Sequence, residues 1–243
     1  MRLSVCPHDI VKQMQTWLDF ATYLQRRLNT PISLEPVTDF DSFYKESLPY
    51  AHLAFVNPMD AWVLVQQHHF LPLFRTELYD EVVFITRKEN REATLEDFAG
   101  QVIAAVDRQF ATYLGLYILQ ERGLTVAGVA FHPSWIQVIR VLMRGEFTYG
   151  LLYRDFYTGL SDLSREQFHV VWESQTGYAT HMMLLHPEYG HWQDRIEQVL
   201  ATMHEDPEGA AILNTLRLGR WVPSRDLGTI ERIVTLRVNP VTS

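Results

Sequence analysis

Residues 151–157, with the sequence LLYRDFY, place an arginine among aromatic side chains where we predict that a strand ends. The guanidinium group of Arg154 is always charged and can neutralise an anionic ligand, while Tyr153 or Tyr157 packs against the ligand's apolar part. The alternative is that Arg154 forms a surface ion pair with Asp155 or Asp162. The first interpretation makes Tyr153 and Arg154 ligand-binding residues.

Other predicted strands end in segments that also carry polar side chains. In α/β sheets, ligands bind outside the carboxyl ends of strands and against the N-termini of the following helices. The candidates at such ends are His8 after the first strand, Asn57 after the third, and Asp107 after the strand that ends at residue 106. Tyr79 is a further ligand-binding candidate.

The sequence shows no established catalytic or metal-binding motif. The histidines lack the spacing of a metal-ligand pair on one helix, and neither Gly-x-Ser-x-Gly nor a glycine-rich phosphate loop occurs. Cys6 and His8 are close in sequence, but a buried structural thiol explains Cys6 better than a nucleophile does. We therefore predict no catalytic residue, no metal site and no cofactor.

Composition limits the partners of the chain. The 243 residues carry a formal net charge of −8, which gives no general attraction for nucleic acid or anionic lipid. No run of about 18 apolar residues occurs, so no membrane-spanning helix is expected. The single cysteine, Cys6, excludes an intrachain disulfide.

The order of predicted elements indicates an α/β protein, because short apolar runs alternate with amphipathic helical patterns. The predicted strands cover residues 3–6, 32–37, 52–56, 82–86, 102–106, 129–132, 147–153, 168–173 and 179–185. The predicted helices cover residues 9–28, 40–47, a segment from 58, 111–122, 133–144, 191–203, 207–216 and 224–238.

The elements group into two lobes. Residues 87–93 are highly charged and contain no large apolar side chain, so we predict that the chain crosses between lobes there. The predicted return crossing lies near residues 177–180. Lobe I then comprises residues 1–88 and 178–243, and lobe II comprises the inserted residues 89–177.

The order of elements and three short segments resemble the phosphate/phosphonate-binding branch of the type II periplasmic binding proteins, the solute receptors of ABC transporters. The segments are HLAFVNP at residues 52–58, TLEDFAG at 94–100 and RGEFTYG at 144–150. The resemblance covers residues 1–235. It implies two lobes with mixed sheets flanked by helices, a hinge between them, and closure around a small ligand.

Two departures from the family pattern concern the pocket. Where phosphonate-binding members carry a run of small hydroxyl residues, this chain has FATY at residues 110–113, which leaves Thr112 and Tyr113 as hydroxyl candidates. Where relatives carry Ser-His-Asp at the next helix start, residues 134–136 are SWI, so Trp135 replaces the imidazole. The resemblance and these changes together imply a flatter or more apolar ligand than phosphonate.

The predicted function is a solute-binding protein for a small polar or anionic ligand, with an ABC transporter permease or a signalling protein as partner. The alternative is a cofactor-independent enzyme on the same scaffold, similar to menaquinone- or pyrimidine-precursor proteins, for which His8 and Asp107 are the candidate catalytic groups. A third hypothesis is a domain that mediates protein contacts and binds nothing small.

The resemblance implies a periplasmic location, and a cytoplasmic one is the alternative because residues 1–9 lack the pattern of a secretory leader.

Overall fold

The computed structural model describes residues 1–224 and 227–241. The chain divides into two compact units, and each is described by itself. Unit 1 comprises Met1–Tyr79 and Ala179–Gly228, and unit 2 comprises Asp80–Tyr178 and Thr229–Ser243. No helix within the described ranges combines the length and apolar character that crossing a membrane requires.

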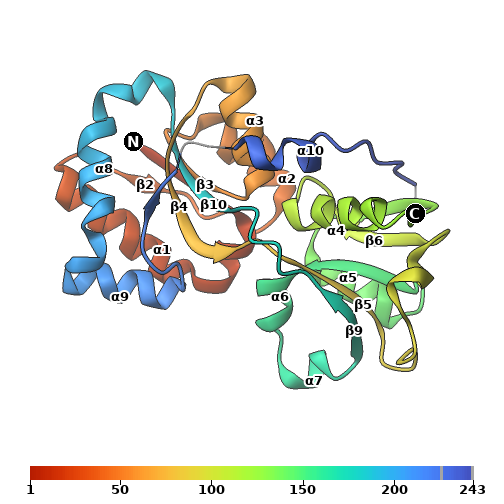
Figure 1. The fold of residues 1–243 in the computed structure, drawn as a ribbon. Coiled ribbons are helices and arrows are strands. Elements are labelled where there is room, and N and C mark those ends of the chain that lie inside the picture. Colours follow the sequence, from red (N-terminus) through yellow and green to blue (C-terminus); the bar gives the residue numbers. More distant parts are fainter. Residues whose placement is uncertain (225–226, 242–243) are drawn as a thin grey trace. The chain divides into compact units, whose positions relative to one another are not determined.

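Unit 1 contains a six-stranded mixed sheet among its described residues, in the order β11-β4-β10-β3-β1-β2 (Figure 1). Its strands are β1 (Arg2–Val5), β2 (Ser33–Leu34), β3 (Leu53–Val56), β4 (Leu71–Tyr79), β10 (Thr180–Leu185) and β11 (Val222–Pro223). Strands β1, β2 and β3 are parallel, and β10 is antiparallel to both β3 and β4.

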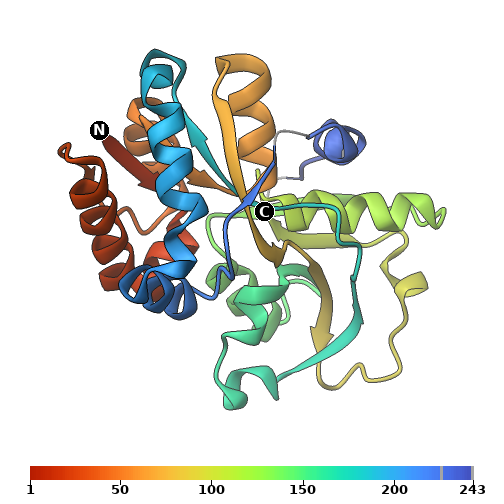
Figure 2. The ribbon, with the colours of Figure 1, turned by 60° about the vertical axis from the view of Figure 1, so that its left-hand side comes forward.

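The helices of unit 1 are α1 (Pro7–Leu28), α2 (Phe40–Ser42), α3 (Pro58–His68), α8 (Gln193–Ala201) and α9 (Pro207–Leu216). Helices α1, α8 and α9 share one apolar core with the sheet and lie together in Figure 2. Within this core the rings of Trp17 of α1 and Phe55 of β3 pack at a tilt of 40°, with their centroids 4.8 Å apart. The core therefore fixes α1 against the strands that precede and follow it.

Unit 2 contains a five-stranded sheet among its described residues, in the order β7-β6-β8-β5-β9. Its strands are β5 (Val82–Arg87), β6 (Val102–Val106), β7 (Gly128–His132), β8 (Tyr149–Tyr153) and β9 (Phe168–Glu173). The helices are α4 (Phe110–Glu121), α5 (Trp135–Met143), α6 (Arg154–Thr158), α7 (Asp162–Arg165) and α10 (Glu231–Val234), and a 3₁₀ helix covers Leu95–Phe98. Strands β6, β7 and β8 are parallel, whereas β5 is antiparallel to β8 and β9.

The boundary between units differs from the predicted one. Strand β5 pairs with β8 and β9, so it belongs to unit 2, whereas the predicted crossing at residues 87–93 would place it in lobe I. The charged segment after Arg87 connects two elements of unit 2. The second boundary, after Tyr178, lies within the range predicted for the return crossing.

Buried Glu81 organises the chain at the beginning and end of unit 2. Its carboxylate accepts hydrogen bonds from the Ser174 hydroxyl, from the Thr176 hydroxyl at 3.2 Å, and from the Gly177 amide at 2.8 Å. Because Gly177 has φ +61°, a residue without a side chain is favoured at this turn. One carboxylate thus joins the segment before β5 to the segment after β9.

Strand β4 was not predicted. Pro72 interrupts its sequence pattern, and proline argues against an interior strand because it cannot donate to the ladder. In the structure Pro72 pairs with Leu184 next to a register shift, so an irregular position accommodates it.

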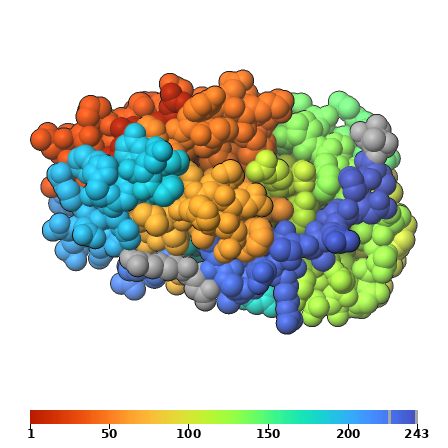
Figure 3. Space-filling view, turned by 90° about the horizontal axis from the view of Figure 1, so that it is seen from above, coloured from red at the N-terminus to blue at the C-terminus, as the bar shows by residue number. Residues whose placement is uncertain are grey.

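The predicted helix 224–238 is wrong over most of its described residues, and residues 225–226 lie outside the described part. A 3₁₀ turn, Gly228–Ile230, and the short α10 are followed by a non-helical segment that forms a β-bridge between Val129 and Pro240. This segment satisfies backbone groups of β7, an edge strand of the sheet. Figure 3 shows the C-terminal segment running along the region of α4, which α10 contacts. These residues belong to unit 2 rather than to the predicted lobe I.

Gly209 in α9 should tolerate no side chain. A Cβ atom there would lie 2.2 Å from the carbonyl oxygen of Met203, which is a backbone atom that cannot rotate away. We expect Gly209→Ala to lower the free energy of unfolding by about 1–3 kcal/mol, measured by urea denaturation.

The matched control is Gly190→Ala, where the nearest atom is Leu71 Cδ1 at an ordinary 3.6 Å. Equal stability of the two variants would contradict the packing described for α9.

Candidate functional site

The strand ends of unit 1 bring several polar side chains to one edge of the sheet. Parallel strands β1 and β3 both end there, at Val5 and Val56. Strand β10 runs in the opposite direction and pairs Met182 with Val56, so it begins at the same edge. His181, near the start of β10, consequently lies beside the residues that begin α1.

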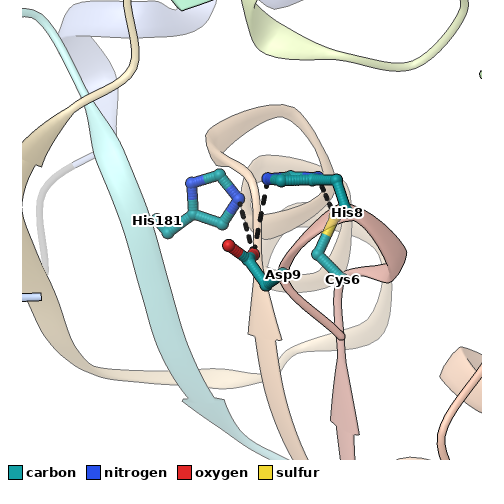
Figure 4. A group of neighbouring side chains, drawn as sticks. All are labelled: Cys6, His8, Asp9 and His181. Atoms are coloured by element: carbon teal, nitrogen blue, oxygen red, sulfur yellow. Dashed lines mark hydrogen bonds and ion pairs between the residues drawn. The ribbon is translucent and has the colours of Figure 1, made fainter. Parts of the chain in front are cut away.

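Cys6, His8, Asp9 and His181 form a cluster at this edge (Figure 4). Cys6 Sγ lies 3.2 Å from His8 Nδ1, and Asp9 Oδ2 lies 3.4 Å from His8 Nε2 and 3.5 Å from His181 Nε2. Ligand atoms from all four residues lie within 4.8 Å of one another. The cluster combines sulfur, nitrogen and oxygen donors, which are the atoms that bind transition metals in proteins.

Aromatic neighbours hold the two imidazole rings in place. The His8 and His181 rings meet edge to face with their centroids 5.1 Å apart, and Phe55 packs 5.3 Å from the His181 ring. The side chains of His8 and His181 are 8% and 6% exposed, whereas Asp9 is 18% exposed. The cluster is thus enclosed but keeps one carboxylate in contact with solvent.

Asn57, a predicted ligand-binding residue, serves as the N-cap of α3. Its Oδ1 accepts a hydrogen bond from the Met59 amide at 2.9 Å, and its Nδ2 donates to buried Asp60 at 2.7 Å. The Tyr44 hydroxyl also donates to Asp60, at 3.1 Å. These contacts give Asn57 a structural role in positioning α3.

Tyr79 ends β4 opposite Thr180, and therefore lies at the same edge of the sheet as His181. The residue is 38% exposed, and the guanidinium group of Arg75 lies 5.9 Å from its ring centroid.

In unit 2, the parallel strands β6, β7 and β8 end at one edge of the second sheet. The remaining predicted site residues follow these ends: Asp107, Thr112 and Tyr113 after β6, Trp135 after β7, and Tyr153 and Arg154 at the end of β8. The sequence prediction therefore selected residues that share an edge within unit 2.

The hydroxyl groups at the start of α4 are used within the protein. The fully buried Thr112 donates to the Val106 carbonyl at 2.7 Å, and the Tyr113 hydroxyl donates to Asp107 Oδ1 at 2.9 Å. Burial, reinforced by the Asp107 charge, raises the pKa of Tyr113, so its hydroxyl stays protonated and remains a donor. Both predicted ligand hydroxyls thus hold the β6–α4 connection in this structure.

Trp135 begins α5, after the N-cap Ser134. The side chain is 2% exposed, and its indole Nε1 is buried with no hydrogen-bond partner among the described residues. Phe156 lies 6.4 Å away, ring centroid to ring centroid. A buried donor without a partner costs free energy, which a bound acceptor would recover.

Arg154 begins α6, and its Nη1 lies 3.6 Å from Glu173 Oε1. The two side chains are 24% and 40% exposed, so this ion pair contributes at most about 1 kcal/mol. Tyr153 is buried beside Arg154 at the end of β8. Glu173, which lies near Arg154 in the structure, is not one of the acidic partners that sequence spacing suggested.

The sequence prediction did not include Cys6, Asp9, His181 or His132 among the site residues. Cys6, His8 and Asp9 lie within four residues of chain, but their partner His181 is remote in sequence and the β10–β3 pairing brings it near. His132 ends β7, and its Nε2 is buried with no hydrogen-bond partner among the described residues. Burial lowers the pKa of His132, against a smaller opposing effect of the Glu146 carboxylate.

The lowered pKa of His132 has a consequence for stability. The unfolded chain binds a proton at this histidine more readily than the folded chain, so stability falls as the pH falls through about 6.5, the unfolded value. We expect the melting temperature of His132→Gln to decrease less than that of the wild type between about pH 7.5 and pH 5.5.

His204→Gln removes an exposed histidine of unit 1 and serves as the control for the loss of a histidine. Parallel curves for His132→Gln and the wild type would show that His132 is not held neutral by burial.

The chain matches the family model for the periplasmic substrate-binding protein of ABC phosphonate transporters over residues 3–227. No curated protein sequence matches it.

Solved structures share the fold across nearly the whole chain. PhnD1 from Prochlorococcus marinus, in complex with methylphosphonate, aligns with a TM-score of 0.80 and 14% identity over 96% of both chains. A binding component of an ABC phosphonate transporter from Pseudomonas aeruginosa aligns with a TM-score of 0.77 and 11% identity, over 96% of this chain and 84% of that one.

The alkanesulfonate-binding protein SsuA from Xanthomonas axonopodis pv. citri, bound to MOPS, has a TM-score of 0.67 and 13% identity, over 96% of this chain and 82% of that one. These likenesses confirm the predicted fold class, the type II periplasmic-binding-protein fold with mixed sheets flanked by helices.

Proposed function

The chain belongs to the family of periplasmic substrate-binding proteins of ABC phosphonate transporters, and we propose that its ligand is a small organic anion with an apolar part. Family membership confirms the resemblance predicted from the sequence and makes the chain a solute-binding protein rather than an enzyme. The finer assignment concerns which ligand it binds and which residues contact it.

The observation that carries the proposal is the buried indole N–H of Trp135, which has no hydrogen-bond partner among the described residues. It lies at the start of α5, where ligands of α/β sheets bind. An anionic oxygen would satisfy this donor, and the aromatic surfaces of Trp135 and Phe156 suit an apolar substituent.

Arg154 supplies the positive charge in this proposal. It follows the carboxyl end of β8, in the same unit as Trp135, and its ion pair with Glu173 is partly exposed at 3.6 Å. A ligand anion can replace such a pair at little cost, because exposed ion pairs are weak. Tyr153 precedes Arg154 in the chain and is buried at the end of β8.

The other residues that the sequence predicts as ligand contacts differ in the interactions that they already make within the protein. Thr112 and Tyr113 already bond within the chain, so we propose that they position Asp107 and the start of α4. His8 and Tyr79 lie at the strand-end edge of unit 1, and we retain them as ligand contacts. Asn57 supports that edge as the cap of α3.

The family works with ABC transporters, and we propose a transporter permease as the protein partner and the periplasm as the location. A signalling partner is the second candidate. Closure of two lobes around the ligand stays a prediction from the sequence.

A thermal-shift screen tests the ligand class. Methylphosphonate, phenylphosphonate, inorganic phosphate, an alkanesulfonate and free amino acids are compared at equal concentration. We expect phenylphosphonate to raise the melting temperature more than methylphosphonate, because only the former can pack against the aromatic surfaces. A larger shift with inorganic phosphate than with any organic anion would contradict the proposal.

Variants test the contacts by calorimetric titration with the best compound. Trp135→Phe keeps an aromatic ring but removes the indole donor, and Arg154→Ala removes the charge. Each should weaken binding by about tenfold or more, which corresponds to about 1.4 kcal/mol.

Arg140→Ala, at an exposed position on the same helix as Trp135, is the matched control and should bind like the wild type. If Trp135→Phe and Arg154→Ala also bind like the wild type, the ligand contacts lie elsewhere.

A further inference from the structure

We propose that His8, Asp9 and His181 bind one divalent transition-metal ion, for which Zn²⁺ is the best match, and that Cys6 orients His8. The site lies at the start of α1 and of β10 in unit 1 (Figure 4). Metal binding at this site does not rest on the proposed solute.

The separations between the donor atoms suit a metal better than hydrogen bonds. Asp9 Oδ2 lies 3.4 Å from His8 Nε2 and 3.5 Å from His181 Nε2. Charge-assisted hydrogen bonds between such groups are about 2.7–2.9 Å long. Tetrahedral zinc, with bonds of about 2.0–2.1 Å to nitrogen and oxygen, separates its ligand atoms by about 3.3 Å. The spacing around Asp9 matches the zinc geometry.

The donor atoms converge in an enclosed place. His8 Nε2, Asp9 Oδ2 and His181 Nε2 are all buried, and Asp9 Oδ2 makes no hydrogen bond with any described residue. A carboxylate oxygen shielded from water in this way is costly unless a cation or a donor compensates it. A metal ion between the three atoms would supply that compensation.

Cys6 fits the role of a supporting residue. Its Sγ lies 3.2 Å from His8 Nδ1, the ring nitrogen turned away from Asp9. Metal-binding histidines usually donate their second ring N–H to a neighbouring acceptor, which fixes the tautomer and the ring orientation. A thiol sulfur can accept that hydrogen bond weakly, and Nε2 then keeps its lone pair for the metal.

The same residues do not favour a nucleophilic cysteine. A chain from thiol to imidazole to carboxylate could activate Cys6, but this residue is 0% exposed. A metal ion needs only to reach Asp9, which is 18% exposed.

Two histidines and one carboxylate are a known ligand set for zinc with a fourth position left open. An oxygen of an anionic solute could occupy this position, because the cluster lies at the strand-end edge of unit 1. Binding of a solute oxygen at the fourth coordination position rests on the proposed function, and it fails if the proposed function fails.

The test uses the full chain without an affinity tag, treated with a chelator, and titrated with ZnCl₂ by calorimetry in the absence of any solute. We expect one Zn²⁺ per chain. His181→Ala and the nearly isosteric Asp9→Asn should each weaken binding by about tenfold or more. Circular dichroism and the melting temperature without metal establish that both variants fold.

His204→Ala is the matched control, since His204 is an exposed histidine of the same unit, 3.9 Å from Glu205. It should bind Zn²⁺ like the wild type. Absence of one-to-one binding in the wild type, or unchanged affinity in Asp9→Asn, would overturn the site. Because no solute is present, this outcome is independent of the ligand screen.

Cobalt substitution tests the role of Cys6. A Co²⁺ ion bound by nitrogen and oxygen should show tetrahedral d–d absorption without an intense thiolate charge-transfer band in the near ultraviolet. Appearance of that band, and its loss in Cys6→Ser, would overturn the assignment of Cys6 as a supporting residue.

Discussion

The antiparallel pairing of β10 with β3 is the interaction on which the candidate site of unit 1 depends. Its register places Met182 opposite Val56, at the edge where β1 and β3 end. His181 therefore meets His8 and Asp9, although the two segments are far apart in sequence. A shift of one residue would turn the His181 side chain to the opposite face of the sheet. The register is secured because β10 is completely buried between β3 and β4.

At the strand-end edge of unit 2, a carboxylate lies near the start of α4. The Asp107 carboxylate near the start of α4 accepts hydrogen bonds from the Tyr113 hydroxyl and the Arg108 amide. A negative group there offsets the positive end of the helix dipole, so this helix start is a poor place for a second anion. The proposed function therefore places the anion at Trp135 and Arg154, after the neighbouring strands.

Much of the fold could be predicted from the sequence because apolar periodicity is a local property. Strands β6 and β9 and helix α9 have the predicted bounds. Two predictions failed for physical reasons. Pro72 interrupts the sequence pattern of β4, so this strand was not predicted. The segment after α10 pairs with β7 instead of continuing as a helix. Sequence patterns identified the strand ends that carry the candidate site residues. They did not show which hydroxyl groups form hydrogen bonds within the protein, as that of Thr112 does. His181 could not be identified as a site residue from local sequence patterns, because the pairing of β10 with β3 determines which residues lie beside it.

Hydrogen exchange with and without ligand tests the central claim that function lies at the carboxyl ends of the strands. The compound that gives the largest thermal shift would be added at saturation, and amide protection followed by mass spectrometry. The account predicts added protection in peptides that contain Trp135 and Arg154 in unit 2. Protection confined to helices away from these edges, such as α8 and α9, would contradict it.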